Sequence, residues 1–395
     1  MSVNEYGIAD FNYIATGAAI LASGGGGSYL DAVTVIKELA DSGWRGTVRV
    51  QDYDSATDCC VLALMGSPDA ATGLTLAQIQ DSIANTVGAL EQATGFPLGC
   101  VVPVEIGAIN SIVPLIAAAM SSNAINWVVD GDGAGRSVPE LPQTTYGGSA
   151  SLAASPCALA NDVSQKPLIQ SVTLNAPTSA TIESLAGGVV SAFRSYSGIA
   201  LWPSNSSNAH ALSGNYIPGT LSQVRELGSF LANTPTPPKT ADVVAQIGKI
   251  TGRTTSAILT NFFITAITQS TTSGSLDAGI IQLDNHPDQR LSTETHYLYN
   301  LNENLIMYSS LSKQPDVIAP DSICYYSEST CFGFSNAIND LAVFFDAKFG
   351  TSTGRTVSVI KVAALPEFYN ATGVIASFAR LLRSIGYAGA LPYSA

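Results

Sequence analysis

Two uninterrupted runs of apolar residues constrain the fold of this chain more than any other feature of its sequence. Residues 59–65 are entirely apolar, and residues 99–104 contain only Gly, Cys, Val and Pro. A strand with one face in water alternates polar and apolar side chains, so strands without this alternation need cover on both faces. Helical patterns lie between these runs. The sequence therefore predicts an α/β fold with a mostly parallel sheet and flanking helices.

Further elements of the first half fit this fold. A helical pattern at residues 12–22 ends at Ser23 and four glycines, whose backbone entropy prevents the helix from continuing. Ser28 then suits the N-cap of a second helix, which we expect to extend through residue 39. We also expect strands at 47–50 and 126–129 and helices at 76–93 and 109–119.

The length of 395 residues favours two domains. We place an N-terminal α/β domain at residues 1–165, carrying the functional site, and a C-terminal domain at residues 166–395. The second is predicted to be β-rich after a Pro-rich linker at 234–238 and to end in a helix at 375–382. Its other expected elements are a helix at 220–232 and strands at 168–174, 199–201, 256–265, 279–283 and 295–299.

Charge and hydropathy exclude several kinds of partner. The net charge is −13 with only 12% charged residues, whereas nucleic-acid binding needs clustered Lys and Arg. No apolar run reaches the ~18 residues of a membrane span, and the N-terminus lacks the early basic residues of a targeting signal. We therefore expect a soluble, cytoplasmic protein. Its low charge suits a homo-oligomer, because surface charge normally opposes association.

Cysteine and histidine give little support to metal or triad chemistry. The six cysteines form no C-x-x-C pair, and Cys59, Cys60 and Cys100 are expected to be buried thiols. Cys157 is the one first-half cysteine outside a strand-like run, which leaves it as an alternative nucleophile. The three histidines lack metal-ligand spacing, and no Gly-x-Ser-x-Gly elbow is present. Hydrolytic chemistry here would use carboxylates, a thiol or a carboxylate-bound metal.

Polar clusters follow three of the predicted strands, at 66–69, 105–110 and 130–140. Ligands of open α/β sheets bind beyond the carboxyl ends of the strands, and neighbouring carboxylates shift one another's pKa values. The predicted catalytic residues on this edge are Glu105, Asp130, Asp132 and Arg136. An ordinary Asp-Gly turn at residues 130–135 remains the alternative, because Asp and Gly tolerate turn geometries. The segment also resembles a calcium-binding loop, but its acidic residues do not have the spacing of that loop.

The glycines at 24–27 have no P-loop or dinucleotide spacing, so we expect a close backbone approach to a ligand or another loop. The residues predicted to bind substrate are Gly25, Gly26, Ser67, Asn110, Glu140, Gln143 and Thr144.

These clusters, in this order, resemble the S-methyl thiohydantoin desulfurase family, formerly catalogued as a domain of unknown function. Ala108, Ala134, Ser137 and Val138 depart from the family pattern. The matching segments are residues 17–21, 23–27, 65–68, 103–107, 110–111, 129–132, 135–136 and 139–141, then 219–221, 302–304 and 315–318 of the second half.

The resemblance implies hydrolytic removal of a sulfur substituent from a five-membered cyclic amide, in the breakdown of sulfur-bearing histidine derivatives. Water would attack the ring carbon that bears the S-methyl group, with Glu105, Asp130 or Asp132 as general base, and methanethiol would leave. Arg136 would bind a carboxylate or carbonyl of the substrate.

No cofactor is expected under this interpretation. Two alternatives stay open. One is a cyclic amide hydrolase that uses a divalent metal held by Asp130 and Asp132. The other is a non-catalytic subunit, either a homo-oligomer or a partner of a hydantoinase-like chain, since related proteins occur beside or fused to hydantoinase and oxoprolinase subunits.

Overall fold

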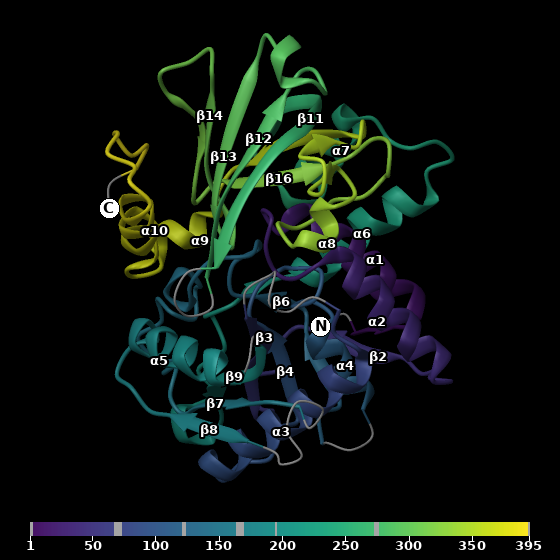
Figure 1. The fold of residues 1–395 in the computed structure, drawn as a ribbon. Coiled ribbons are helices and arrows are strands. Elements are labelled where there is room, and N and C mark those ends of the chain that lie inside the picture. The colour runs from purple at the N-terminus through teal and green to yellow at the C-terminus, as the bar shows by residue number, and fades with distance from the viewer. Residues whose placement is uncertain are drawn as a thin grey trace.

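Two large β-sheets, one in each half of the molecule, organise the fold (Figure 1). The structure is a computed structural model. It describes residues 3–66, 73–120, 124–162, 170–193, 196–271 and 276–393.

The first sheet has eight strands within the described residues, and only its centre is parallel. The pairings β2–β5, β5–β4 and β4–β3 are parallel, whereas the outer pairings are antiparallel. The predicted mostly parallel sheet is therefore only partly parallel, because burial on both faces does not specify the direction of a neighbour. The strand order is β1 (Val3–Tyr6), β2 (Val48–Gln51), β5 (Trp127–Val129), β4 (Cys100–Pro103), β3 (Cys59–Gly66), β9 (Tyr196–Ser204), β7 (Cys157–Ala160) and β8 (Ser171–Leu174).

Strand β3 shows why the apolar runs predicted coverage on both faces. Cys60, Leu62 and Leu64 enter one hydrophobic core, and their neighbours Cys59, Val61 and Ala63 enter another on the opposite face. Alternate residues of a strand point to opposite sides, so an uninterrupted apolar run serves two cores.

Helices cover both faces of this sheet. On the first face lie α1 (Ile8–Leu21), α2 (Tyr29–Asp41), α3 (Leu76–Thr94) and α4 (Val113–Ala119). Helix α6 (Thr220–Asn233) packs against α1, and α7 (Thr240–Thr251) packs against α6 and against strand β11 (Thr255–Thr271) of the second sheet. The opposite face packs against α5 (Ser179–Ala192). Ser28 caps α2 as predicted, since its hydroxyl accepts the Asp31 N–H at 3.1 Å.

Helices α1 and α6 approach each other through glycine. A Cβ on Gly17 would lie 1.9 Å from the Val224 carbonyl oxygen, and one on Gly228 would lie 1.9 Å from the Tyr13 carbonyl oxygen. The absence of both side chains lets the two backbones touch. This contact holds α6, from the second half of the chain, against the first helix.

The second sheet has seven strands within the described residues, all antiparallel, and confirms the β-rich second half. Their order is β15 (Pro315–Ile318), β14 (Glu303–Ser309), β13 (Thr295–Leu301), β12 (Asp277–Asp284), β11 (Thr255–Thr271), β19 (Thr356–Val362) and β16 (Ser322–Tyr326). Two short ladders join β6 (Gly131–Asp132) to β10 (Ile217–Pro218) and β17 (Phe345–Asp346) to β18 (Thr351–Ser352).

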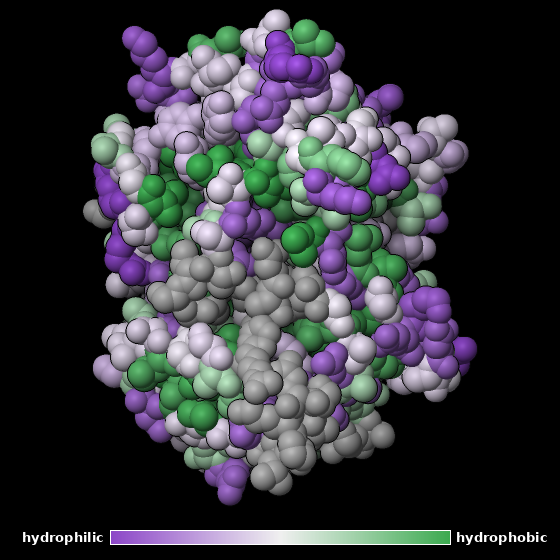
Figure 2. Space-filling view, viewed as in Figure 1, coloured by the Kyte–Doolittle hydropathy of each residue, from purple (hydrophilic) through white to green (hydrophobic). Residues whose placement is uncertain are grey.

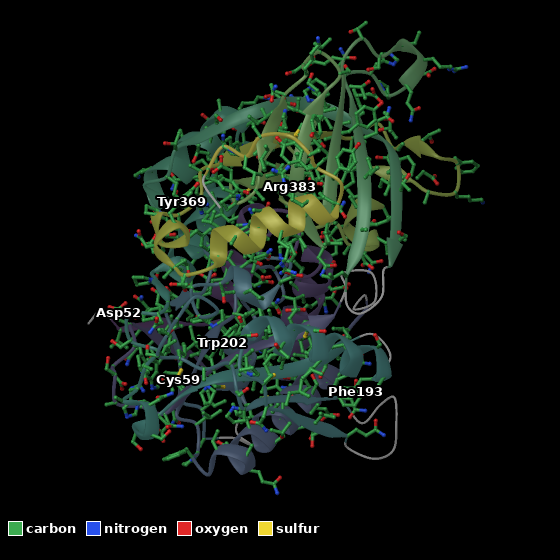
Figure 3. All side chains as sticks on the ribbon, turned by 90° about the vertical axis from the view of Figure 1, so that its left-hand side faces the viewer. Asp52, Cys59, Phe193, Trp202, Tyr369 and Arg383 are labelled. Carbon is green, nitrogen blue, oxygen red and sulfur yellow. The ribbon has the colours of Figure 1, made fainter. Side chains whose placement is uncertain are left out.

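Three further helices accompany the second sheet, namely α8 (Ile338–Leu341), α9 (Pro366–Asn370) and α10 (Val374–Ser384). The last is the predicted terminal helix. Figure 3 shows α10, marked by Arg383, along the junction of the two halves, with Trp202 in the half below it. The predicted domain limit at residue 165 falls between β7 and β8, which pair in one sheet, and the segment at 234–238 connects α6 to α7.

The surface mixes residue types. Figure 2 shows hydrophobic residues on one face of the molecule in separate patches among hydrophilic ones. No helix within the described ranges is both long and apolar enough to cross a membrane.

Candidate active site at the domain junction

A cavity lies where the two halves of the chain meet, and we call it the junction cavity. It has a volume of about 110 Å³, against the ~10–15 Å³ that one buried water needs, so it has room for a small organic molecule. Its lining comprises residues 26–28, 63–66, 104–105, 109–110, 138–141 and 302–303, with Leu74, Thr144, Glu183 and Ile199.

Glu105 lies two residues beyond the end of β4 and borders the cavity. Its Oε1 accepts the Asn110 side-chain N–H at 2.9 Å, and its Oε2 accepts the Val138 backbone N–H at 2.8 Å. The Asn110 side-chain oxygen accepts the Leu64 N–H at 3.2 Å, which ties this arrangement to β3. Burial raises the pKa of Glu105 to about 7, although both hydrogen bonds favour the ionised form.

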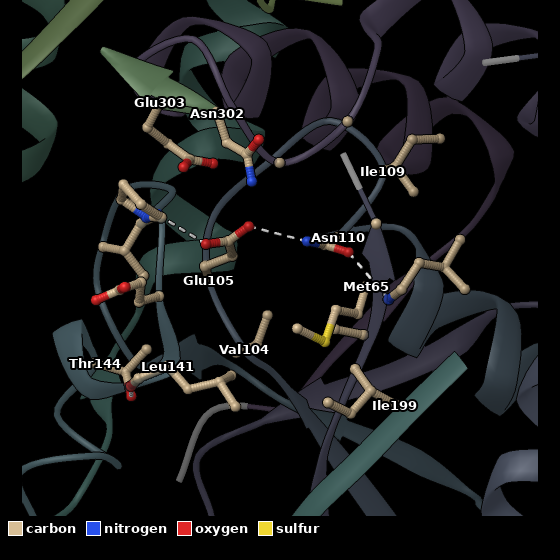
Figure 4. A pocket seen from close by; sticks show the side chains of 18 of the residues that line it. Met65, Val104, Glu105, Ile109, Asn110, Leu141, Thr144, Ile199, Asn302 and Glu303 are labelled. Atoms are coloured by element: carbon tan, nitrogen blue, oxygen red, sulfur yellow. Dashed lines mark hydrogen bonds between the residues drawn. The ribbon is translucent and has the colours of Figure 1, made fainter. Parts of the chain in front are cut away.

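Glu303 comes from the other half of the chain, as the first residue of β14. Figure 4 shows its carboxylate, Glu105 and Asn302 bordering the same space. Glu303 is buried, and its Oε2 has no hydrogen-bond partner within the described residues. Burial and the nearby charge of Glu105 raise its pKa well above the ordinary value, while the charge of Arg136 opposes the shift. Burial and the charge of Glu105 both favour the protonated form of the Glu303 carboxyl.

The glycine loop, residues 23–28, forms the roof between these carboxylates. A Cβ on Gly25 would lie 1.8 Å from Glu303 Oε1, and one on Gly26 would lie 2.3 Å from both Gly107 Cα and Ser137 Oγ. The Gly26 carbonyl accepts the Ile109 N–H at 3.0 Å. The expected close approach of this loop is confirmed: it meets the Glu105 loop on one side and Glu303 on the other.

A third wall is acidic as well. Glu183 of α5 accepts the Leu141 N–H at 2.9 Å, and burial raises its pKa to about 7. Glu140 forms an ion pair with Arg380 at 2.6 Å. The backbone N–H of Glu140 donates to the Gln143 side-chain oxygen at 3.0 Å at the start of the 3-10 turn η1 (Leu141–Gln143).

Thr144 follows η1 and lines the cavity. Its hydroxyl donates to the Leu141 carbonyl at 2.8 Å and accepts the Gly147 N–H at 3.0 Å. This side chain thus fixes the turn that carries Leu141 into the cavity wall.

The carboxylates of Asp130 and Asp132 accept hydrogen bonds from neighbouring segments of the protein and do not face the cavity. Asp130 accepts the Ser222 N–H at 3.0 Å in the first turn of α6 and also the Ser222 hydroxyl. Asp132 accepts the N–H groups of Ala134 and Gly135 at 2.8–3.0 Å, as an Asp-initiated turn does. Burial raises the pKa of both carboxyls, that of Asp132 to about 7. Neither residue is among those that line the cavity.

Arg136 is fully buried and points toward the second sheet. It donates to the carbonyls of Ser137 and Pro320 at 2.8 Å, Asp321 at 3.0 Å and Asn304 at 3.3 Å. Its guanidinium also lies 5.7 Å from the centre of the Phe378 ring. Burial lowers its pKa. The side chain joins the two halves of the chain and places a positive charge near Glu303.

The structure therefore brings Glu105, Asn110, Glu140, Gly26 and Thr144 to one cavity and directs Asp130, Asp132 and Arg136 elsewhere. Gly25 contacts Glu303 from outside the lining, Gln143 supports the wall, and Ser67 lies outside the described residues. Cys157 sits inside β7, where burial raises its pKa far above the ordinary value. Its expected position outside a strand was wrong.

Sequence reasoning missed Glu303 and Glu183 as site residues. The Asn302-Glu303-Asn304 tripeptide carried a signal, because it stood among the segments that resemble the known family. Glu183 carried none. Among the described residues, no group of three or more His, Cys, Asp or Glu is arranged to hold a metal ion.

Fold and site together define a two-domain α/β and β-rich protein with a buried acidic cavity between its halves. The chain belongs to the S-Me-THD-like family: residues 9–171 match the model of its N-terminal domain and residues 177–375 that of its C-terminal domain. This confirms the resemblance to the S-methyl thiohydantoin desulfurase family.

A solved structure of another protein is similar to this chain over nearly its whole length. The X-ray crystal structure of a protein from Chromobacterium violaceum, a Northeast Structural Genomics Consortium target, has a TM-score of 0.78 and 25% sequence identity, covering 99% of each chain. No curated protein matched.

Proposed function

We propose that the protein is a hydrolase that removes the S-methyl group of a thiohydantoin, a five-membered cyclic amide, and releases methanethiol. The observation that carries this proposal is the pair of buried glutamates, Glu105 and Glu303, on one small cavity. Two carboxyls in different protonation states are what a hydrolysis without a covalent intermediate requires.

The proposed reaction starts with a water molecule beside Glu105. Ionised Glu105 takes a proton from the water molecule. The oxygen of this water attacks the ring carbon that bears sulfur, and Glu303 donates its proton to the adjacent ring nitrogen. The resulting tetrahedral carbon bears OH, S-methyl and N–H. Glu303 then accepts the OH proton as the carbonyl forms, and the C–S bond breaks. Glu105 returns its proton to the leaving thiolate, so both groups recover their starting states.

Several features support this assignment of roles. Both oxygens of Glu105 accept hydrogen bonds that stabilise its charge, whereas one oxygen of Glu303 has no partner among the described residues. A thiolate leaves readily, since thiol pKa values lie at roughly 8.5–10. The family of the chain fits a thiohydantoin as substrate.

The test is release of methanethiol from an S-methyl thiohydantoin by the purified protein. We expect Glu105→Gln and Glu303→Gln each to lower kcat by about 10²–10⁴-fold, while Glu226→Gln, an exposed carboxylate on α6, keeps wild-type turnover. Unchanged turnover in both cavity variants would overturn the proposed mechanism.

The proposed steps use only carboxylates and water. We therefore expect turnover to survive prolonged treatment with chelator. Loss of turnover that added divalent metal restores would favour the metal-dependent alternative instead. If the protein binds a thiohydantoin and never turns it over, the binding-subunit alternative gains the support.

A further inference from the structure

The lining of the junction cavity has a polar side and an apolar floor, next to the acidic wall of Glu140 and Glu183 described above. Glu105, Asn302 and Glu303 border the polar side, and Met65, Val104 and Ile199 border the floor, which we call the apolar half (Figure 4). Leu141 lies where the floor meets the acidic wall, because its backbone N–H binds Glu183. A ligand that fills this cavity must therefore carry polar atoms on one edge and a compact apolar group on the other, because an unpaired polar atom on the apolar side would lose its hydrogen bonds to water.

We infer that the apolar half is a subsite for the alkyl group on sulfur and that its packed floor limits the length of this group. The inference rests on the hydrolase function proposed above and adds to it the feature of the substrate that the cavity selects. With the S-alkyl group on the apolar side, the amide edge of the ring faces Glu105 and Glu303. The carbon that bears sulfur then lies between the two halves.

The backbone of the described residues explains why the floor of this subsite resists displacement. Ile199 on β9 pairs directly with Ala63 on β3, and both side chains are 2% exposed. Val104 is 6% exposed and immediately precedes Glu105. Two sheet strands and the end of a third thus form the floor, and strands of a sheet centre yield less than loops. A longer alkyl group would have to displace close-packed side chains.

Substitutions at Ala63 and Ile199 can change the size of the subsite in opposite directions at one point of its floor. Ala63→Val adds two methyl groups toward the space that the S-methyl group would occupy. Ile199→Val removes one and enlarges that space. Both replacements introduce Val, which suits a strand, so the fold should tolerate each of them.

The experiment is calorimetric titration of the protein with four ligands: hydantoin and the S-methyl, S-ethyl and S-propyl thiohydantoins. Glu105→Gln serves as the background if the unmodified protein turns the ligands over. We expect the protein without substitutions at residues 63 and 199 to bind the S-methyl ligand at least 10-fold more tightly than the S-propyl ligand. Ala63→Val should weaken binding of the S-methyl ligand at least 10-fold and change hydantoin binding less than 2-fold.

Ile199→Val should shift the preference between S-methyl and S-ethyl thiohydantoin by about 4-fold toward the longer group, the value of roughly one buried methylene. Val172→Ala, on β8 outside the cavity lining, is the matched control and should leave every ratio unchanged. Equal effects of Ala63→Val on hydantoin and on the S-methyl ligand would overturn the inference, as would absence of binding by the S-alkyl ligands.

The two proposals fail in different ways. Size-selective binding that follows residues 63 and 199, without methanethiol release, would support the subsite and reject the hydrolase. Methanethiol release with no dependence on alkyl length or on these residues would support the hydrolase and reject the subsite.

Discussion

At the scale of single residues, the two cavity glutamates differ in their hydrogen bonds more than in their burial. Glu105 and Glu303 are 6% and 3% exposed, so both lose the hydration that an ionised carboxyl needs. Only Glu105 has an N–H donor at each oxygen. When two carboxyls interact, the protons leave in two steps that belong to the pair. Glu105, whose negative charge is stabilised by two N–H donors, therefore carries most of the charge after the first proton has left.

This difference predicts the pH profile of turnover. The base must be ionised, so kcat/KM should rise as pH increases through about 7, the raised pKa of Glu105. The acid must keep its proton, so the rate should fall again at a higher pH, above the raised pKa of Glu303. Steady-state kinetics from pH 5 to 10 measure both limbs. Glu303→Gln should remove the alkaline limb from the residual activity, and a rate that falls between pH 6 and 8 would contradict the assignment.

At the scale of elements, the glycine loop controls how closely the two halves meet. Gly26 has φ +67° and lies against Gly107 and Ser137. A side chain here would meet backbone, which cannot move aside as the end of a long side chain can. The loop therefore sets the distance between the Glu105 loop and β14, and with it the height of the cavity.

Gly26→Ala should accordingly destabilise the protein much more than the same change at a matched glycine. Gly252 has the same φ of +67° and no atom within 4 Å of an added Cβ. Strain alone predicts a loss of ~1–2 kcal/mol at Gly252, whereas the overlap at Gly26 should bring the total there to about 3 kcal/mol or more. Urea unfolding gives both free energies. Equal losses would show that the loop has room to move away from Gly107.

The elements also show how far the sequence alone could lead. Strands β2, β3, β4 and β5, the cap at Ser28 and the final helix followed from apolar patterns and local chemistry, which act over a few residues. The direction of β9 did not, because a run buried on both faces is compatible with either direction of its neighbour.

The candidate site was predictable to a similar extent. Glu105 and Asn110 followed from their position beyond β4. Asp130, Asp132 and Arg136 follow a neighbouring strand, yet their side chains bind the α6 N-terminus, a local turn and the carbonyls of the second half. The turn at Asp132 is the local Asp-Gly turn that the sequence left open as the alternative. The partners of Asp130 and Arg136 lie 92 and up to 185 residues away in the chain, and no local pattern encodes them. Glu303 depends on the same long-range packing.

At the scale of the whole molecule, Arg136 joins the halves through carbonyls of Asn304, Pro320 and Asp321. Its removal would take a donor from all three carbonyls, two of which belong to buried residues, and each buried acceptor left without a donor costs ~1–3 kcal/mol. We predict that Arg136→Ala lowers the free energy of unfolding by about 3–5 kcal/mol. Arg290→Ala, which breaks an exposed pair with Asp288, should cost less than ~1 kcal/mol. Thermal or urea unfolding compares the two, and similar small losses would show that Arg136 is not a structural link.

Stability as a whole should fall from acidic to mildly alkaline pH. Burial raises the pKa of Glu105 and Asp132 to about 7 from 4.5 and 3.8. The folded state binds these protons more tightly than the unfolded chain, so their contribution is complete below pH ~4 and is lost as pH rises through about 7. Carboxyls with lowered pKa values, such as Asp54 and Asp284, change the free energy of unfolding only at lower pH, where they become protonated.

We therefore expect the free energy of unfolding at pH 8 to be on the order of 2–5 kcal/mol lower than at pH 5.5. Urea titrations at the two pH values measure this difference. Glu105→Gln should make it smaller, and Glu226→Gln should leave it as in the wild type. A protein that gains stability over this range would show that these carboxyls ionise freely in the folded state.

The origin of the two cavity glutamates in different halves has a consequence for how such proteins can be recombined. A chimera that joins the first half of this chain to the second half of a relative inherits one carboxyl from each parent. It also inherits an interface between the halves in which Gly25 must pack against a glutamate and Arg136 must donate hydrogen bonds to three carbonyls of the other half. Exchange between relatives is then restricted to parents that agree at these few positions, and a crossover that ignores them would separate the two members of an acid–base pair.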